Sequence, residues 1–336
     1  MTGAELTELA TELGIDAVGV ALVAPYEDTE RHIRERRERG LFADMRFTMA
    51  RPEVSCHPAS LLAGAKSVIA GALCYYREGS DLAPDEGRLP RYTWRDEYAL
   101  LRDRLDELGR RLGGAYRVLV DENDHVDRAA AVRAGIAFYG KNTLAITRRH
   151  GSWVVLGALV TEVEIEPSPP LELDCGDCRL CIDACPTGAL DDPGVLDATK
   201  CLSYWTQAPA SIPDAYRAEL GAMVYGCDIC QEVCPWNRGI EKRRQSDDGA
   251  TDPRGRVSLA DWLERDAADL VADVDRLYVP RNDARWLRRN ALVAAGNVGT
   301  PALVPLVDRY AAAADDDPML RETARWARRR MEERRA

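Results

Sequence analysis

The sequence has no run of about 18 consecutive apolar residues, which excludes a membrane-spanning helix. It also lacks two marks of exported proteins: a twin-arginine pair near Met1, and a basic segment followed by an apolar one. Without an export signal, a chain with 10 cysteines is predicted to be cytoplasmic and to keep its thiols reduced. Disulfides are therefore not expected.

Positive charge is in the minority, because 45 Lys and Arg stand against 56 Asp and Glu, giving a formal net charge of −11. That balance argues against broad, non-specific binding of nucleic acid. It leaves room for a local basic surface in the last 16 residues, where seven arginines occur: Arg321, Arg325, Arg328, Arg329, Arg330, Arg334 and Arg335. A solvated helix face and a phosphate-binding surface are both open interpretations.

Cysteine is concentrated in one stretch, residues 175–237. The stretch opens with Cys175-x2-Cys178-x2-Cys181-x3-Cys185-Pro186, continues with Cys201 and closes with Cys227-x2-Cys230-x3-Cys234-Pro235. The run C-x2-C-x2-C-x3-C-P is the spacing of bacterial ferredoxins, in which the fourth cysteine of the run ligates the other of two [4Fe–4S] clusters. The spacing therefore predicts two clusters.

These eight cysteines match the number of ligands that two clusters need. We assign Cys175, Cys178, Cys181 and Cys234 to the first cluster, and Cys185, Cys201, Cys227 and Cys230 to the second. Zinc is the alternative, although two zinc sites rarely show a third cysteine at this spacing followed by x3-C-P. Two clusters indicate electron transfer but do not name a substrate.

The residues before the cysteines alternate between strand and helix patterns. Apolar runs predict strands at 15–23, 67–75, 116–120, 143–146 and 153–161, and helical spacing predicts helices at 4–12, 27–40, 95–113 and 126–135. This alternation predicts an α/β domain over residues 1–165. The prolines of 164–170 indicate a linker.

Two further domains are predicted after the linker. Residues 166–242 contain all the cluster motifs, and the polar residues 242–256 are predicted to be a loop. Only helical patterns follow, in a third domain over residues 257–336. The amphipathic stretch 283–299 contains Gly296-Asn297 near its end, and a proline-led helical pattern comes next, which is typical of HEAT-type repeats.

Two segments outside the cysteine motifs carry candidate chemistry. Residues 135–142 nearly match a phosphate-binding P-loop, but Asn142 stands where Ser or Thr would hold magnesium, so nucleotide hydrolysis is not favoured. Asp121 directly follows a predicted strand. A carboxyl there, partly withdrawn from water, can have a raised pKa and donate a proton, whereas a helix-capping aspartate is the alternative. His125 is expected to be an exposed loop histidine.

Together these motifs resemble the epoxyqueuosine reductases, cobalamin-dependent iron–sulfur enzymes that complete queuosine in tRNA. The resemblance rests on both cysteine motifs and on shorter matches over most of residues 60–299: Arg91-Tyr92-Thr93-Trp94 with Tyr98, Val120-Asp121 with Arg128, Gly140-Lys141-Asn142-Thr143, Gly151-Ser152-Trp153, and Arg285-Trp286-Leu287-Arg288-Arg289-Asn290. One departure is Ala99, which stands where the family has a histidine.

The resemblance implies an α+β or α/β multidomain chain with an N-terminal α/β cobalamin-binding domain, a ferredoxin-like domain with two [4Fe–4S] clusters, and a C-terminal HEAT-like domain. It implies reduction of epoxyqueuosine, at the anticodon wobble position, to queuosine, with electrons passing through the clusters to cob(II)alamin. The family's general acid corresponds to Asp121. Contacts with cobalamin are expected from Arg51, Asp121, Lys141, Asn142, Thr143 and Ser203.

The implied partners are a tRNA with a queuosine-type anticodon and a low-potential electron donor of the flavodoxin or ferredoxin type, with the chain acting as a monomer away from membranes. No Asp-x-His-x-x-Gly motif is present, so no protein ligand below the cobalt is expected. A reductive dehalogenase is one alternative, but such enzymes usually carry a twin-arginine signal and lack the helical tail. A plain electron carrier is another, although it would not need so large an α/β domain.

Overall fold

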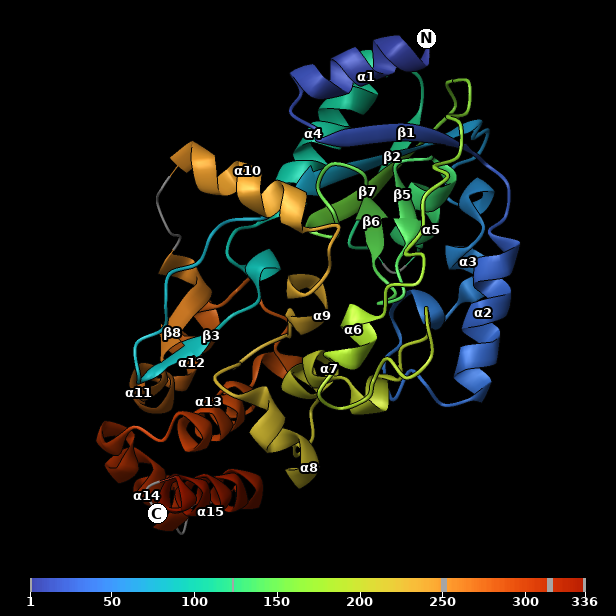
Figure 1. The fold of residues 1–336 in the computed structure, drawn as a ribbon. Coiled ribbons are helices and arrows are strands. Elements are labelled where there is room, and N and C mark those ends of the chain that lie inside the picture. The colour runs from blue at the N-terminus through green and yellow to red at the C-terminus, as the bar shows by residue number, and fades with distance from the viewer. Residues whose placement is uncertain (1, 123, 249–252, 313–316, 335–336) are drawn as a thin grey trace.

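A computed structural model describes residues 2–122, 124–248, 253–312 and 317–334. Its N-terminal part is built on a four-stranded sheet in the order β1-β2-β7-β4, formed by Ala17–Leu22, Ser67–Cys74, Val154–Thr161 and Tyr116–Val120. Helices α1 (Gly3–Glu12) and α4 (Glu97–Leu112) pack on one face of the sheet. The other face is covered by α2 (Glu27–Glu38), α3 (Pro52–Ser55) and α5 (Asp127–Arg133) (Figure 1).

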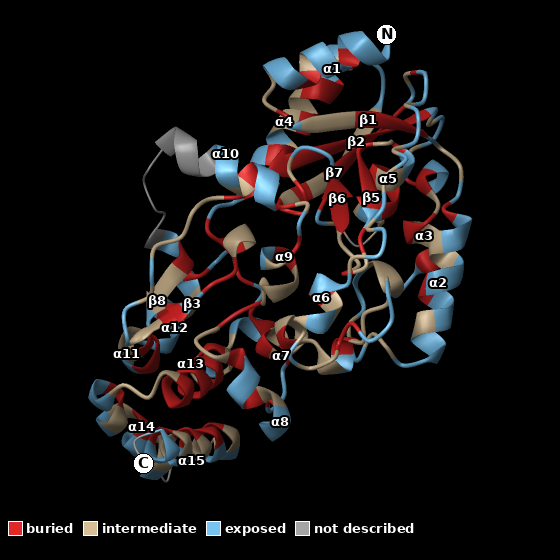
Figure 2. Cartoon of the chain, viewed as in Figure 1, coloured by how far each residue is buried: buried red, intermediate tan, exposed pale blue. Residues whose placement is uncertain are grey.

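The central strand β2 is buried along its whole length. Ile69 and Leu73 enter the core beneath α1 and α4, whereas Val68, Ala70 and Ala72 enter the core beneath α5. Because helices cover both faces of the sheet, both sets of side chains must be apolar. This explains the continuous apolar run in the sequence. Figure 2 shows a second buried region around α13 (Arg285–Val298), at the far end of the molecule.

All pairings in the four-stranded sheet are antiparallel. The predicted strands and helices of this part are confirmed to within a few residues. β2 and β4 run in the same direction, and β7 lies between them in the opposite direction. The order of the strands depends on the insertion of β7 between β2 and β4. The local sequence of each strand does not indicate this insertion. A second, short pair is formed by β5 (Ala137–Tyr139) and β6 (Ala145–Thr147).

The C-terminal part is helical, with α13 preceded by α11 (Leu259–Glu264) and α12 (Ala267–Asp273) and followed by α14 (Val304–Ala312) and α15 (Pro318–Glu333). The core of these helices also takes in earlier residues, among them Leu89, Trp94, Val224 and Tyr225. An antiparallel pair, β3 (Glu86–Arg88) and β8 (Arg256–Ser258), runs beside that core. None of the helices in the described parts of the chain has the length and apolar character that a membrane span needs.

The cysteine loops lie between the sheet and the C-terminal helices (Figure 1). They carry four short helices, α6 (Leu180–Asp183), α7 (Leu202–Gln207), α8 (Asp214–Arg217) and α9 (Ile229–Glu232). As predicted, 164–170 forms neither helix nor strand. The predicted loop at 242–256 is wrong in its first part, because α10 runs over Arg238–Asp248 and buries Ile240 in the sheet core. Residues 249–252 of that predicted loop lie outside the described chain.

Candidate functional site

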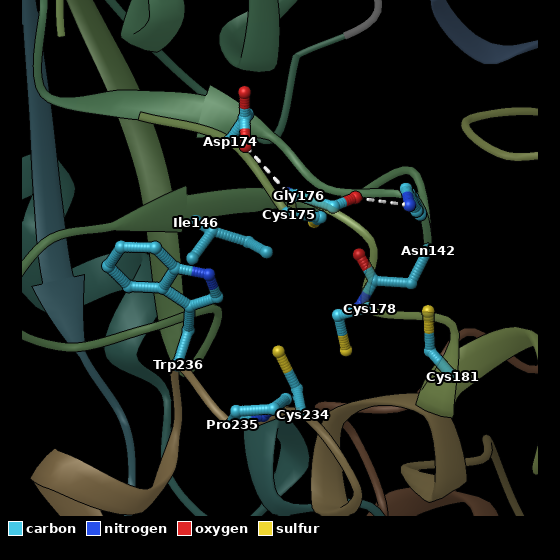
Figure 3. A pocket seen from close by; sticks show the side chains of 11 residues that line it. Asn142, Ile146, Asp174, Cys175, Gly176, Cys178, Cys181, Cys234, Pro235 and Trp236 are labelled. Atoms are coloured by element: carbon cyan, nitrogen blue, oxygen red, sulfur yellow. Dashed lines mark hydrogen bonds between the residues drawn. The ribbon is translucent and has the colours of Figure 1, made fainter. Parts of the chain in front are cut away.

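Four cysteines converge on one cavity beside the sheet. Cys175, Cys178, Cys181 and Cys234 line a cavity of about 400 Å³, and in Figure 3 the side chains of Cys178, Cys181 and Cys234 surround its central space. The other lining residues are Lys141, Asn142, Ile146, Asp174, Gly176, Pro235 and Trp236. Among the described residues, no three His, Cys, Asp or Glu side chains are grouped to hold one metal ion. A cavity of this size ringed by four thiols fits a polynuclear cluster better than a single zinc ion.

The other four motif cysteines, Cys185, Cys201, Cys227 and Cys230, form a second group. Cys227 interacts electrostatically with Cys201 and Cys185, and Cys230 interacts with Cys227 and Cys201. Burial raises the pKa of Cys227 to about 12. Because iron binds thiolates, a cluster held here would have to supply enough positive charge to outweigh this burial. All ten cysteines are free thiols. Cys230 also interacts with Cys181 of the first group, so the two groups lie close together, and the assignment of the eight cysteines as ligands stays a prediction.

A buried polar network fastens the first group to the sheet. Asn237, which follows Cys234 closely, is fully buried. Its side-chain oxygen accepts the Ser152 N–H at 2.7 Å, and its amide donates to the Gln231 carbonyl at 2.7 Å. Gln231, in α9, donates in turn to the Tyr75 hydroxyl at 2.9 Å. Ser152 and Tyr75 adjoin neighbouring strands, so these bonds fix the last cysteine loop against the sheet edge.

Arg91, from the Arg-Tyr-Thr-Trp segment, holds the second group in place. Its guanidinium carbon lies 5.1 Å from the centroid of the Trp153 ring, and its Nη1 lies 3.0 Å from the Glu232 carboxylate. The main-chain N–H of Arg91 donates to Asp228 at 2.8 Å. Asp228 stands inside the last cysteine motif, so this segment positions the cysteines of that motif.

Asp121 lies directly after β4, with a backbone φ of 57°. Its side chain is exposed, but neighbouring protein withdraws it partly from water. This desolvation, and then the charge of Asp127, raise the pKa of the Asp121 carboxyl, while Arg102 opposes the shift. A raised pKa keeps a carboxyl protonated at higher pH, as a proton donor requires. The alternative of a helix cap is wrong, because Val126 precedes α5.

His125 is fully buried, so the expectation of an exposed loop histidine is wrong. Its Nε2 lies 3.1 Å from the Tyr26 hydroxyl, and its Nδ1 lies 3.1 Å from Asp127 Oδ1. Tyr26 is 99 positions away in the chain, so no local pattern indicates this contact. Sequence reasoning missed both partners of His125, Tyr26 and Asp127, and it missed the effect of Asp127 on Asp121.

Arg51 and Thr143 lie near the segment that carries Asp121. The Arg51 guanidinium pairs with Asp124 at 2.6 Å. Arg128, in the first turn of α5, donates to the Thr143 carbonyl at 3.2 Å. Arg51 therefore contacts Asp124 and Thr143 contacts Arg128, so both lie beside residues 121–128. Their contact with cobalamin stays a prediction.

Lys141, Asn142 and Ser203 lie toward the cysteine loops. Lys141 Nζ donates to the Gly176 carbonyl at 2.6 Å, and the Asn142 amide reaches the Cys230 carbonyl at 3.5 Å. These bonds place residues 141–142 between the two cysteine groups. Ser203 is in α7, the helix that follows Cys201 directly. Their predicted contact with cobalamin likewise stays a prediction.

Comparison with protein families finds two matches within the chain. Residues 174–237 match a 4Fe-4S double cluster binding domain. Residues 56–122 match the family described as epoxyqueuosine reductase QueG, DUF1730. The first match contains all eight motif cysteines, and the second ends one residue after Asp121.

Relatives align with almost the whole chain. The epoxyqueuosine reductase of Bacillus anthracis is 34% identical, over 94% of this chain and 85% of its own. That of Lactococcus garvieae is 32% identical, over 98% and 95%. A crystal structure of epoxyqueuosine reductase with an epoxyqueuosine-modified tRNA-Tyr stem loop is 31% identical, covers 98% of this chain and 89% of its own, and has a TM-score of 0.86.

A structure of the Bacillus subtilis epoxyqueuosine reductase is similar as well, with a TM-score of 0.85, 29% identity, and coverage of 98% of this chain and 90% of its own. In that structure a catalytic loop that carries an aspartate is swung out of the active site.

Proposed function

The chain belongs to the epoxyqueuosine reductase family, and on this premise we propose that it reduces epoxyqueuosine in tRNA to queuosine. The observation that carries the proposal is the presence, in one molecule, of two groups of four thiols and an exposed carboxyl with a raised pKa. The reaction consumes two electrons and two protons and releases one water. The thiol groups are suited to electron delivery, and the carboxyl is suited to proton delivery.

Asp121 is the proposed general acid. It would donate its proton to the epoxide oxygen as the C–O bond breaks, and a second proton would complete the departing water. Its exposure allows contact with a substrate, and its raised pKa keeps the proton in place until the bond breaks. Burial also raises the pKa of the nearby Tyr98 hydroxyl, which therefore stays neutral and can donate a hydrogen bond to the same oxygen.

Two [4Fe–4S] clusters fit the thiol groups. Cys175, Cys178, Cys181 and Cys234 would hold the first cluster and Cys185, Cys201, Cys227 and Cys230 the second, as the cavity and the double-cluster family match support. When bound, the clusters and cobalamin would supply the two electrons for the epoxide carbon.

Cobalamin is proposed to bind across the face that contains Asp121. Asp121, Arg128 and Tyr139 all have exposed side chains there. Arg128 interacts electrostatically with Tyr139, and Tyr98 interacts with both Arg128 and Asp121. An open face with several polar groups in mutual reach suits a broad cofactor with many amide side chains.

For tRNA, we propose a contact with the exposed arginines of α15. Arg325 and Arg329 are exposed, whereas Arg328 is paired with Asp308 at 2.8 Å. Exposed guanidinium groups on one helix can bind phosphates although the chain is acidic overall. A flavodoxin or ferredoxin type donor, a monomeric state and a cytoplasmic location complete the proposal.

The test is anaerobic turnover. The full chain, reconstituted with iron, sulfide and cobalamin, is incubated with dithionite and tRNA that carries epoxyqueuosine, and the digested nucleosides are analysed by mass spectrometry. We expect loss of one oxygen from the modified nucleoside. Asp121→Asn should lower the rate by a factor of about 10² to 10⁴, with unchanged iron content. Asp28→Asn, at an exposed aspartate on α2, is the matched control.

The outcomes separate the alternatives. If the loaded protein leaves the nucleoside unchanged but removes halide from aryl halides, it is a dehalogenase-like reductase. If it binds no corrinoid and only passes electrons, it is a carrier. Full activity of Asp121→Asn would support the proposed reaction but would show that Asp121 is not its general acid.

A further inference from the structure

A line of hydrogen-bonding groups runs through the core beside Asp121. The side chains of Tyr26 and His125 are both fully buried, and the Asp127 side chain is only 19% exposed. Tyr26 and His125 are 3.1 Å apart at their bonding atoms, and so are His125 and Asp127. Arg133 closes the far end, with its guanidinium carbon 5.2 Å from the centroid of the Tyr26 ring.

The line reaches Asp121 through the main chain. The backbone N–H of Asp121 lies within electrostatic reach of the Asp127 carboxylate and helps to stabilise its charge. Asp121 has a left-handed backbone conformation, with φ of 57°, which is unfavourable for a residue other than glycine unless its surroundings hold it. The attraction between this N–H and the Asp127 carboxylate is such a restraint on the peptide that carries the acid.

We propose that Tyr26, His125 and Asp127 form a buried latch that holds Asp121 in position for proton donation. These are positioning residues, because none of the three contacts the substrate in the proposed reaction. The latch rests on the proposed function for its purpose, but its geometry is independent of that function. The catalytic loop that swings out in the Bacillus subtilis structure shows that such a loop has an alternative position against which a latch can act.

The latch also sets the charge next to Asp121. Desolvation raises the pKa of the Asp121 carboxyl, and the like charge of an ionised Asp127 raises it further. The other charged or titratable groups that face this pair come from β4 and its following turn, α4, α5 and the last cysteine segment: Glu122, Tyr98, Arg102, Arg128 and Tyr225. Among them only Glu122 shares the sign of Asp127 and acts directly on Asp121.

His125 has the central place in the latch. Both of its ring nitrogens form hydrogen bonds, one with Tyr26 and one with Asp127. His125 therefore fixes the orientation of the Asp127 carboxylate. Replacing His125 with valine would leave the Tyr26 hydroxyl and one Asp127 oxygen without their partner in the core. The buried carboxylate would then be free to turn away from the Asp121 N–H.

The decisive variant is Asp127→Asn, which keeps the shape and the oxygen acceptor but removes the charge. The Asp121 carboxyl is followed by infrared difference spectroscopy between the full chain and its Asp121→Asn form, both loaded with clusters and labelled with ¹³C-aspartate. We expect the pKa of Asp121 to fall by about one unit. The high-pH limb of kcat should move to lower pH by the same amount, giving about a tenfold loss of rate above that limb and little loss below it.

Two further variants and a control complete the series. His125→Val should lower kcat at every pH and raise the exchange rate of the Asp121 amide hydrogen, because the carboxylate that holds it is no longer oriented. Tyr26→Phe should act in the same direction but less strongly. His57→Gln is the matched control, since His57 also contacts a carboxylate, Glu30, at 2.7 Å, on the α2 side of the same domain.

The proposal is overturned if Asp127→Asn leaves the Asp121 titration and the kcat limb unmoved, or if the Asp121 amide of His125→Val exchanges no faster than that of His57→Gln. A purely structural role would lower the melting temperature without either change. Infrared titration and hydrogen exchange do not depend on turnover. These two measurements can therefore support the latch even if the protein does not reduce epoxyqueuosine. Turnover can likewise support epoxyqueuosine reduction even if the latch is absent.

Discussion

At the scale of single residues, Asn237 makes several hydrogen bonds beside the Cys234 loop. It is fully buried, accepts the Ser152 N–H and donates to both the Ser152 hydroxyl and the Gln231 carbonyl. Gly151, next to Ser152, has no room for a side chain, because a Cβ would lie 1.9 Å from Asn237 Oδ1. The amide is thus tightly surrounded, and each of its partners is itself buried or part of the backbone.

Asn237→Ala should therefore lower the free energy of unfolding by about 3 kcal/mol, because buried groups of Ser152 and Gln231 lose their partners. The neighbouring Cys234 loop should loosen, so iron should be lost from the first cluster before the second. Chemical denaturation and iron content measure both effects. Asn282→Gly is the control: Asn282 is exposed with φ of 52°, a conformation that glycine tolerates, so stability should not fall. Equal effects of the two changes would contradict this account.

At the residue scale, the sequence predicts positions best where the contacts are local. The first cysteine motif places three thiols within a few positions, and the structure gathers these three with Cys234 around one cavity. Asp121 was placed correctly at a strand end. His125 was misjudged because its burial depends on Tyr26, 99 positions away. No periodicity or spacing in the sequence encodes such a contact.

At the scale of elements, α13 supports the helix that follows Cys201. Arg289 is fully buried, and burial lowers its pKa to about 9. Its guanidinium donates to the carbonyls at the end of α7, among them Trp205 at 2.9 Å and Ala208 at 2.7 Å. The carbonyl end of a helix carries partial negative charge, so it accommodates a buried cation without a carboxylate.

Arg289→Met should destabilise the protein by about 3 kcal/mol or more, since the carbonyls at the end of α7 lose their donors. With α7 loosened, Cys201 should hold iron less firmly, and the second cluster should be depleted. Iron content and the electron paramagnetic resonance spectrum after dithionite report this. Arg285→Met, on the exposed face of the same helix, should change neither. Full iron occupancy in Arg289→Met would refute the supporting role.

Element boundaries followed the sequence wherever a hydrophobic pattern was strong. β4 spans Tyr116–Val120 as predicted, and α1, α2, α4 and α5 differ from prediction by a few residues. α10 was missed because its polar sequence resembles a loop, although Ile240 enters the sheet core. The order of strands was also beyond reach, because antiparallel insertion of β7 is a tertiary event.

At the scale of the whole molecule, contacts cross the three predicted domains, whose boundaries stay a prediction. β3, from the first, pairs with β8, near the start of the third. At their junction Gly87 faces Val224 and Leu259, and a Cβ there would lie 2.5 Å from Val224 Cγ1. The C-terminal helices therefore complete a core that earlier segments begin.

A chain shortened to residues 1–248 should consequently fail to fold as a monomer that holds both clusters. It would expose Leu89, Trp94, Val224 and Tyr225, which are now buried against the C-terminal helices, and it would remove Arg289 from α7. We expect aggregation or loss of iron, measured by size-exclusion chromatography and iron analysis under anaerobic conditions. A soluble monomer with full iron content would show instead that the helices are an independent appendage.

A point change in the full chain tests the same junction without truncation. Gly87→Val forces a side chain against Val224 and Leu259 and should lower stability by about 1 to 3 kcal/mol, as overpacking does in a close-packed core. Gly239→Ala, in α10, meets only the end of Arg243, at 3.4 Å, and should be neutral or slightly stabilising, because alanine favours a helix. If Gly87→Val unfolds no earlier than Gly239→Ala, the junction does not couple the two ends of the molecule.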